Sequence, residues 1–313
     1  MLAPQPSVIA KSVHWYQRRW LRLVISLALL ASLLSVVDFS SSRWLESARQ
    51  VIWWPIVVAL LLRPLAVLTN AWHTSLLLDS AGAGLSLREV WSASMFGEML
   101  SRFVPGNLGT IAYVTQLSPR AGDALIAQVL DRVLFLVVIL LAAALSLALA
   151  DHPLLGLLAL GALVAVVLLA VLFYKGVVHW APLGPAPRDA IERMLQRRSH
   201  WGRPYGFACV LSIALMTLLF WLLVVACGGS IDVFESLAAV TLVTIGAALP
   251  FSINGIGIRE WVFVALLRDN FASKEALVTL AAMTYLVGFA SALAGVGTWA
   301  LLRQKSRPID AGG

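Results

Sequence analysis

The stretch VPGNLG at residues 104–109 interrupts an apolar segment, residues 90–120, near its middle. A second apolar segment, residues 235–270, is interrupted in the same way by PFSINGIG at residues 250–257. Proline and glycine break helices, so each segment is expected to form two helices of about 12–16 residues, short for crossing a bilayer. We therefore predict two re-entrant hairpins whose turns are buried in protein or line a cavity, because bare backbone in lipid is costly. The alternative, in which one or both hairpins cross fully, stays open.

The two interrupted segments resemble each other. Each leads through an acidic residue followed by Ala-Leu, at residues 123–125 and 275–277, into a long apolar segment. An odd number of predicted crossings separates the hairpins, so the second enters from the opposite side. The sequence thus predicts an inverted repeat, about 90–150 and about 235–302, and paired interrupted segments are typical of a transporter's midplane site. Chance similarity of apolar segments is the alternative. The predicted turns contain six structural residues: Pro105, Gly106, Gly109, Pro250, Gly255 and Gly257.

The composition is that of a membrane protein. Of the 313 residues, 60% are hydrophobic and 12% are charged, whereas soluble domains carry about 25% charged residues. This balance excludes a disordered chain, a coiled coil and a soluble two-domain enzyme. We predict an all-α polytopic membrane protein, residues 1–313 forming one transmembrane domain with six full spans, or up to eight if the hairpins cross. The predicted spans are residues 20–37, 51–70, 124–150, 154–173, 206–226 and 275–302.

The basic residues predict the orientation. The net charge is +7, and the lysines and arginines gather before the first span, in the loop at about 174–205 and after the last span. With six crossings these three segments share one side, which the positive-inside rule makes the cytoplasm. We expect a bacterial inner-membrane protein with both termini cytoplasmic and no nucleic-acid partner. A cleavable signal peptide at residues 21–37 is disfavoured, because its polar lead is long and no A-x-A site follows.

Several ionisable residues lie at membrane depth, where such residues usually face a cavity or a partner. Glu98 and Arg102 are spaced to pair on one helical face. Asp131 and Arg132 point about 100° apart, so each needs a different partner. Arg259 begins a half-helix, a position suited to a phosphate. The predicted substrate cavity comprises Arg102, Asn107, Asp131, Arg132, Asn254, Arg259 and Glu260.

The alternative for these charges is purely structural. Pairs such as Asp131 with Arg102 can pin the hairpins to the bundle, and Gln128 extends the polar face of the same span. Arg63, beside Pro64, is expected to snorkel or to pair across helices. Taken together, the charges favour a polar central cavity.

Catalytic and metal-binding signatures are absent from the sequence. The chain has no H-E-x-x-H, G-x-S-x-G or phosphate-binding Gly-Lys-Ser/Thr motif, and its five histidines form no ligand cluster. Cys209 and Cys227 are about 27 Å apart on a straight helix and cannot pair there. We expect no enzymatic activity, no cofactor and no metal.

These motifs resemble a known family. Residues 91–136, with FVPGNLG and a following Asp131-Arg132, resemble the first signature of the lysylphosphatidylglycerol synthase transmembrane family, also called flippase-like or UPF0104. Residues 249–277, with GIGIRE at 255–260, are similar to its second signature. The sequence Ala71-Trp72-His73 resembles an Arg-Trp element of the family, with alanine replacing the arginine. The resemblance extends over about residues 15–303.

The resemblance implies lipid translocation, with a membrane lipid as the substrate. The headgroup is expected to carry phosphate, as in a phospholipid or an isoprenoid-linked lipid. Because the chain stops at Gly313, without the family's aminoacyl-transferase domain, synthesis of a lysyl lipid is not expected. Two other functions stay open: a non-transporting membrane partner of a glycosyltransferase or lipid-modifying enzyme, and an ion-coupled transporter of a small polar solute.

Overall fold

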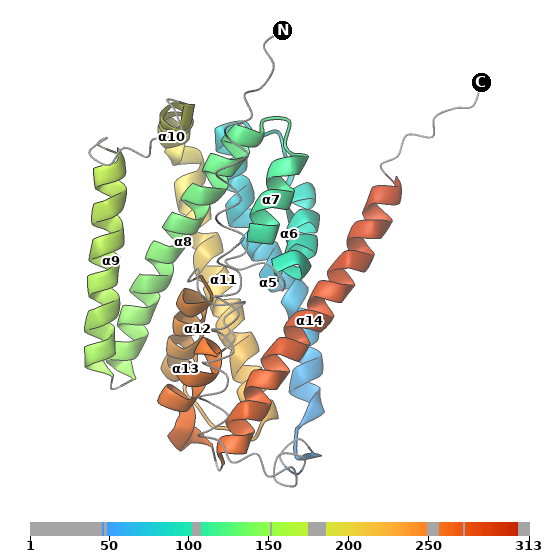
Figure 1. The fold of residues 1–313 in the computed structure, drawn as a ribbon, viewed down its shortest axis with the longest axis vertical. Coiled ribbons are helices and arrows are strands. Elements are labelled where there is room, and N and C mark those ends of the chain that lie inside the picture. Colours follow the sequence, from blue (N-terminus) through green and yellow to red (C-terminus); the bar gives the residue numbers. More distant parts are fainter. Residues whose placement is uncertain are drawn as a thin grey trace, which may run out of the picture.

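The structure is a computed structural model that describes Glu46 and residues 49–101, 108–150, 152–174, 186–248, 257–271 and 273–305. These residues form a bundle of α-helices, α5 to α14, with a short 3-10 turn and no β-strand among them (Figure 1). The predicted all-α, polytopic fold class is confirmed. The first predicted span, residues 20–37, lies outside the described residues.

Five described helices are long and apolar enough to cross a membrane. Three follow the predicted spans closely, and the helix that ends at Ala226 begins eight residues before the predicted start at residue 206. The helix that begins at Trp53 runs eleven residues beyond the predicted end at Asn70. Most of the polar residues after Asn70 are buried inside the bundle, and the helix continues through them. The five helices are α5 (Trp53–Ala81), α8 (Ala121–Leu149), α9 (Pro153–Tyr174), α11 (Arg198–Ala226) and α14 (Lys274–Lys305).

The interrupted segments form two hairpins of short helices. The first comprises α6 (Leu87–Ser101) and α7 (Leu108–Leu117), and the second comprises α12 (Val233–Ala248) and α13 (Ile258–Leu267). At 1.5 Å per residue these helices are about 15–24 Å long, less than the roughly 30 Å of a bilayer core. Each hairpin therefore has the dimensions expected of a re-entrant element.

Polar contacts join the two arms of each hairpin at its open end. The Ser118 hydroxyl, after α7, donates to the carbonyl of Ala83, before α6, at 2.7 Å. The side-chain amide of Asn270, after α13, donates to the carbonyl of Ser230, before α12, at 3.1 Å. Both arms of each hairpin thus begin and end at the same end of the bundle.

The hairpins enter from opposite ends (Figure 1). The backbone N–H of Ile52 donates to the carbonyl of Ala226 at 2.8 Å, so the start of α5 lies beside the end of α11, next to the second hairpin. At the other end, Arg193 of α10 (Ala186–Gln196) pairs with Asp123 at the start of α8, next to the first hairpin. The last turns of α14 lie at this same end, which also carries the basic loop.

The helices that precede the hairpins end alike. The N–H groups of Gly82 and Ala83 bond back to Asp79 and Leu78 after α5. After α11, the N–H groups of Gly228 and Gly229 donate in the same pattern to the carbonyls of Val225 and Val224. Both glycines at the turn have φ near +75°, the left-handed conformation that lets a helix end this way.

The hairpins also begin alike. Ser86 and Glu89 form a capping box before α6, each side chain accepting from the other residue's backbone N–H. Asp232 and Glu235, 146 positions further along, repeat this exchange before α12. The structural repeat therefore comprises a long helix, a hairpin and a second long helix: α5 to α8 in one copy and α11 to α14 in the other.

Candidate functional site

A carboxylate is buried in the middle of the bundle. Asp131 of α8 is 1% exposed, and its Oδ1 lies 2.7 Å from Nδ1 of His73 on α5. Its Oδ2 accepts a hydrogen bond from the Thr74 hydroxyl at 2.9 Å, and its Oδ1 accepts another from the Tyr205 hydroxyl of α11 at 3.1 Å. Two helices, α5 and α11, therefore supply donors to one carboxylate on a third helix, α8.

The network continues through His73. Its Nε2 lies 2.9 Å from Oδ1 of Asn70, and that same oxygen accepts from the Ser212 hydroxyl of α11 at 3.2 Å. Both ring nitrogens of His73 thus lie within hydrogen-bonding distance of oxygen atoms. His73 therefore links the Asp131 carboxylate to Asn70 and, through that amide oxygen, to Ser212 of α11.

Aromatic rings enclose this network. The Phe135 ring stacks on His73 with the ring centroids 5.0 Å apart, and the Tyr205 ring meets His73 edge-on at 5.5 Å. Trp201, one turn before Tyr205, contacts the Tyr205 ring at 5.7 Å. The rings shield the polar groups, so the network fastens α5, α8 and α11 together in a dry environment.

Sequence reasoning found Asp131 but missed its partners. His73 follows the predicted end of its span at residue 70, whereas it lies well inside α5. The spacing of Asn70, His73 and Thr74 places these polar residues on one face of an apolar helix, which is the signal that points to them. Gln128 contacts the first hairpin instead, donating to the carbonyl of Ile111 at 3.2 Å and to Thr115 at 3.0 Å.

A second, partly buried pair joins α5 to the first hairpin. The Arg63 guanidinium pairs with the Glu98 carboxylate of α6, so Arg63 pairs across helices. The partner predicted for Glu98 on its own helical face, Arg102, lies outside the described residues. The Nε atom of Arg63 is buried with no hydrogen-bond partner in the structure.

Arg132 points away from the Asp131 network, as the helical angle between neighbours requires. No ion pair joins it to another described residue, and its Nε is buried without a hydrogen-bond partner. A buried guanidinium nitrogen without an acceptor is costly inside a protein. Arg132 is thus a strong donor not satisfied in this conformation.

The second hairpin carries Arg259 and Glu260 at the start of α13. Arg259 donates to the Thr284 hydroxyl of α14 at 3.0 Å and lies over the Tyr285 ring, 4.2 Å from its centroid. The Glu260 carboxylate accepts from the N–H of Gly257 at 2.7 Å, where the backbone φ is +85°. A carboxylate of the chain itself therefore occupies part of the helix terminus that had been expected to meet a phosphate.

The predicted cavity residues fall into separate groups. Three predicted cavity residues and four predicted turn residues lie outside the described residues: Arg102, Asn107 and Asn254, and Pro105, Gly106, Pro250 and Gly255. Among the described ones, no hydrogen bond or ion pair connects the residues on α8 with those on α13. Gly109 is buried in α7, and Gly257 precedes α13. Their shared lining of one cavity stays a prediction.

The arrangement defines a class of protein: a polytopic membrane protein built from two inverted repeats, each with a hairpin of half-length helices and buried ionisable residues. The family model described as "Lysylphosphatidylglycerol synthase TM region" matches residues 19–297. The chain therefore belongs to that family, as the sequence motifs indicated. No curated protein sequence matches the chain.

Proposed function

We propose that this protein translocates a lipid with a phosphate-bearing headgroup between the leaflets of the bacterial inner membrane. The observation that carries the proposal is the pair of half-length hairpins inserted from opposite ends of the bundle. Such hairpins bring polar turns and helix ends to the membrane interior, where a headgroup has to pass. Membership of a family named for a lipid synthase's membrane region supports a lipid substrate.

The arginines provide the chemistry for the headgroup. Arg132 and Arg259 belong to opposite repeats, and a guanidinium binds phosphate oxygens through a planar fork of donors. Arg132 lacks an acceptor for its buried Nε, while Arg259 is held by a neutral hydroxyl and a ring, neither of which neutralises its charge. A phosphate supplies the negatively charged partner that no ion pair among the described residues gives either arginine.

The carboxylates act differently in this proposal. Asp131 is already committed to His73, Thr74 and Tyr205, so it holds helices together and does not contact the lipid. Glu260 holds the start of α13 through Gly257. The two repeats then rock about the α5–α11 contact and open the central region to each leaflet in turn. In this proposal both termini lie in the cytoplasm, and the protein carries out no covalent chemistry.

Reconstituted vesicles test this function. Wild-type protein is expected to accelerate the inward–outward movement of fluorescent phosphatidylglycerol over protein-free vesicles, measured by chemical bleaching of the outer leaflet. Arg132→Gln and Arg259→Gln are expected to slow it at least about tenfold, the effect of about 1.4 kcal/mol of lost stabilisation. Arg268→Gln, at the exposed far end of the second hairpin, is the matched control and keeps the wild-type rate.

A wild-type rate equal to that of empty vesicles contradicts translocation of that lipid, and unchanged rates in both variants contradict the assignment of the arginines.

One alternative has support from a specific observation: the pairing of Asp131 and of Glu98 is what a non-transporting membrane partner needs. That function predicts no lipid movement together with co-purification of a lipid- or glycan-modifying membrane enzyme.

A further inference from the structure

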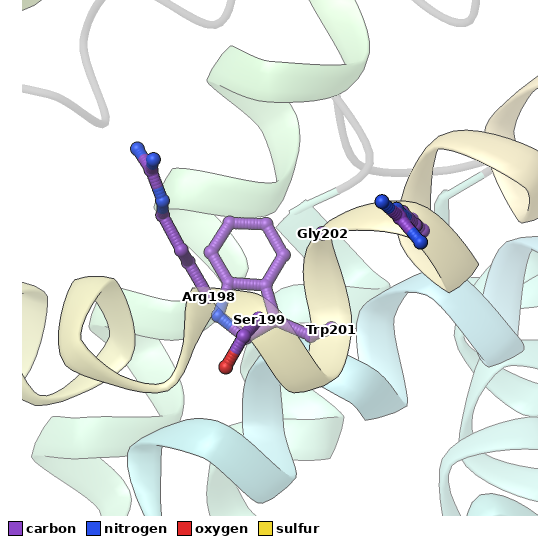
Figure 2. Close-up of a pocket in the computed structure, with 5 residues that line it drawn as sticks. Arg198, Ser199, Trp201 and Gly202 are labelled. Carbon is purple, nitrogen blue, oxygen red and sulfur yellow. The ribbon is translucent and has the colours of Figure 1, made fainter.

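A depression lies at the end of the bundle that carries the basic loop, at the start of α11. Arg198, Ser199, Trp201, Gly202 and Arg203 line it, and its volume is about 560 Å³, within the range of small-molecule sites. Figure 2 shows the Arg198 side chain extending beside the Trp201 ring, with Gly202 close by along the same helix. The depression is outside the region proposed for translocation.

Two arginines that line the depression have no acidic partner among the residues that the structure describes. Arg198 and Arg203 are exposed, and neither forms an ion pair with a described residue. The nearby Arg193, by contrast, is paired with Asp123 at 2.9 Å. Both arginines line the depression and attract an anion, and their planar guanidinium forks fit phosphate oxygens.

Glycines keep the wall of the depression open. Gly202 and Gly206 lie one turn apart inside α11, where glycine is about 1 kcal/mol less favourable than alanine. A Cβ added at either position meets no atom within 4 Å, so packing within the described chain does not require glycine there. Close approach of a ligand to the helix backbone is a physical reason to have glycine at such positions.

The surface below the arginines is apolar. Phe207 and Val210 follow Arg203 at helical spacing on one face of α11, and each is 61% exposed. A ligand with its phosphate at Arg203 can lay a hydrocarbon chain along these two side chains. This combination fits a lipid and not a soluble phosphate ester.

The floor of the site is held firmly. The Trp201 indole N–H donates to the carbonyl of Met194 in α10 at 2.8 Å, and Met194 and Ala190 are fully buried against the bundle. Trp201 and Tyr205, which reaches Asp131, are one turn apart on α11. The wall of the depression is therefore rigid and already shaped before a ligand arrives.

We propose that this depression binds an anionic phospholipid of the adjacent leaflet, with the headgroup phosphate between Arg198 and Arg203 and an acyl chain along Phe207 and Val210. The site is distinct from the proposed translocation pathway, and its existence does not depend on translocation. Binding there orders one lipid beside α10 and α11, at the end of the bundle where the basic residues gather.

Native mass spectrometry of the full chain, released from detergent with added lipid, tests the site. We expect the protein to retain phosphatidylglycerol in preference to phosphatidylcholine. The double variant Arg198→Gln/Arg203→Gln is expected to retain phosphatidylglycerol about thirtyfold more weakly. This factor follows from about 1 kcal/mol of lost binding per arginine, at about tenfold in affinity per 1.4 kcal/mol. Gly202→Leu, which fills the depression without changing charge, is expected to weaken retention as well. Arg268→Gln is the control at the opposite end and keeps wild-type retention.

Unchanged retention in the double variant, or an equal loss in Arg268→Gln, overturns the site. Equal retention of phosphatidylcholine overturns the role of charge, because both lipids carry a phosphate but only phosphatidylglycerol is anionic overall. Displacement of the lipid by millimolar inorganic phosphate shows that the depression recognises free phosphate and overturns the assignment of a lipid. An unchanged melting temperature in the variants shows that these exposed substitutions leave the fold intact.

Discussion

At the residue scale, Asp131 shows how a charge is kept inside a membrane bundle. An aspartate at the centre of a membrane helix costs about 2.5–3.5 kcal/mol on insertion scales. Hydrogen bonds between membrane helices contribute about 0.6 kcal/mol each on average, so neutral donors alone do not offset the cost of inserting the aspartate. Among the three side chains that contact the carboxylate, only His73, 2.7 Å away, is of a type that can also carry a positive charge. The pair is therefore expected to matter more for stability than either of the hydroxyl donors.

Substitutions in this network test whether the His73–Asp131 pair contributes more to stability than the hydroxyl donors do. Asp131→Ala leaves His73 buried without its charge partner and is expected to lower the free energy of unfolding by about 2 kcal/mol or more. Thr74→Val, which removes one hydroxyl donor and keeps the shape, is expected to lower it by about 0.6 kcal/mol. The double variant His73→Leu/Asp131→Leu removes both charges and should be milder than Asp131→Ala. Unfolding of purified protein in mixed detergent micelles measures all three.

Equal losses in Thr74→Val and Asp131→Ala contradict a dominant charge pair. A double variant less stable than Asp131→Ala contradicts the claim that the unpaired histidine is the main penalty.

The sequence alone indicates that Asp131 needs a partner but not which one. His73 and Tyr205 are 58 and 74 positions away along the chain, and they meet Asp131 only because α5 and α11 pack beside α8. Local spacing offered Arg102 as a partner for Glu98 but did not identify Glu98 as the residue that Arg63 contacts across helices. Pairings across helices depend on packing, which a pattern within one segment does not contain.

At the element scale, the hairpins depend on close contact between their two arms. A Cβ on Gly97 of α6 would lie 2.5 Å from the Cα of Thr110 in α7, so only glycine allows this approach. The second hairpin repeats the feature, since a Cβ on Gly246 of α12 would lie 2.4 Å from a methyl carbon of Ile258 in α13. The Pro/Gly breaks were predictable from sequence, but the glycines that allow the arms to pack are visible only in the structure.

Gly97→Ala tests the contact between the arms. The added methyl group meets backbone, which cannot move like a side chain, and overpacking of this kind costs about 1–3 kcal/mol. Gly161→Ala in α9, where a Cβ meets nothing within 4 Å, is the matched control and is expected to stabilise its helix by up to about 1 kcal/mol. Thermal unfolding in detergent should shift in opposite directions for the two variants. A shift in the same direction would mean that the arms are not packed as described.

At the scale of the whole molecule, two copies of one pattern account for the architecture. The helix endings at Gly82 and Gly228 and the capping boxes at Ser86 and Asp232 recur at the same spacing in the two halves. The number of crossings between the hairpins already predicted inversion from the sequence. The inclusion of α5 and α11 in the repeat was not predicted, because the match between their ends rests on backbone hydrogen bonds that only the structure shows.

The central claim is that the two repeats move against each other to carry a lipid headgroup. Helices α6 and α14 belong to opposite repeats and touch where a Cβ on Gly295 would lie 2.9 Å from the Cβ of Met95. Cysteines at these two positions are close enough for a disulfide after a small separation, since its Cβ atoms are about 3.8 Å apart. Replacing Cys209 and Cys227 by alanine removes the native thiols.

The decisive measurement is the rate of fluorescent phosphatidylglycerol movement in vesicles containing Met95→Cys/Gly295→Cys, before and after reduction of the cross-link. The account predicts that the oxidised protein, with cross-linking verified by mass spectrometry, moves lipid no faster than empty vesicles. Reduction of the same sample should restore the rate of the cysteine-free protein. Lipid movement at the full rate while the repeats are cross-linked would contradict the account.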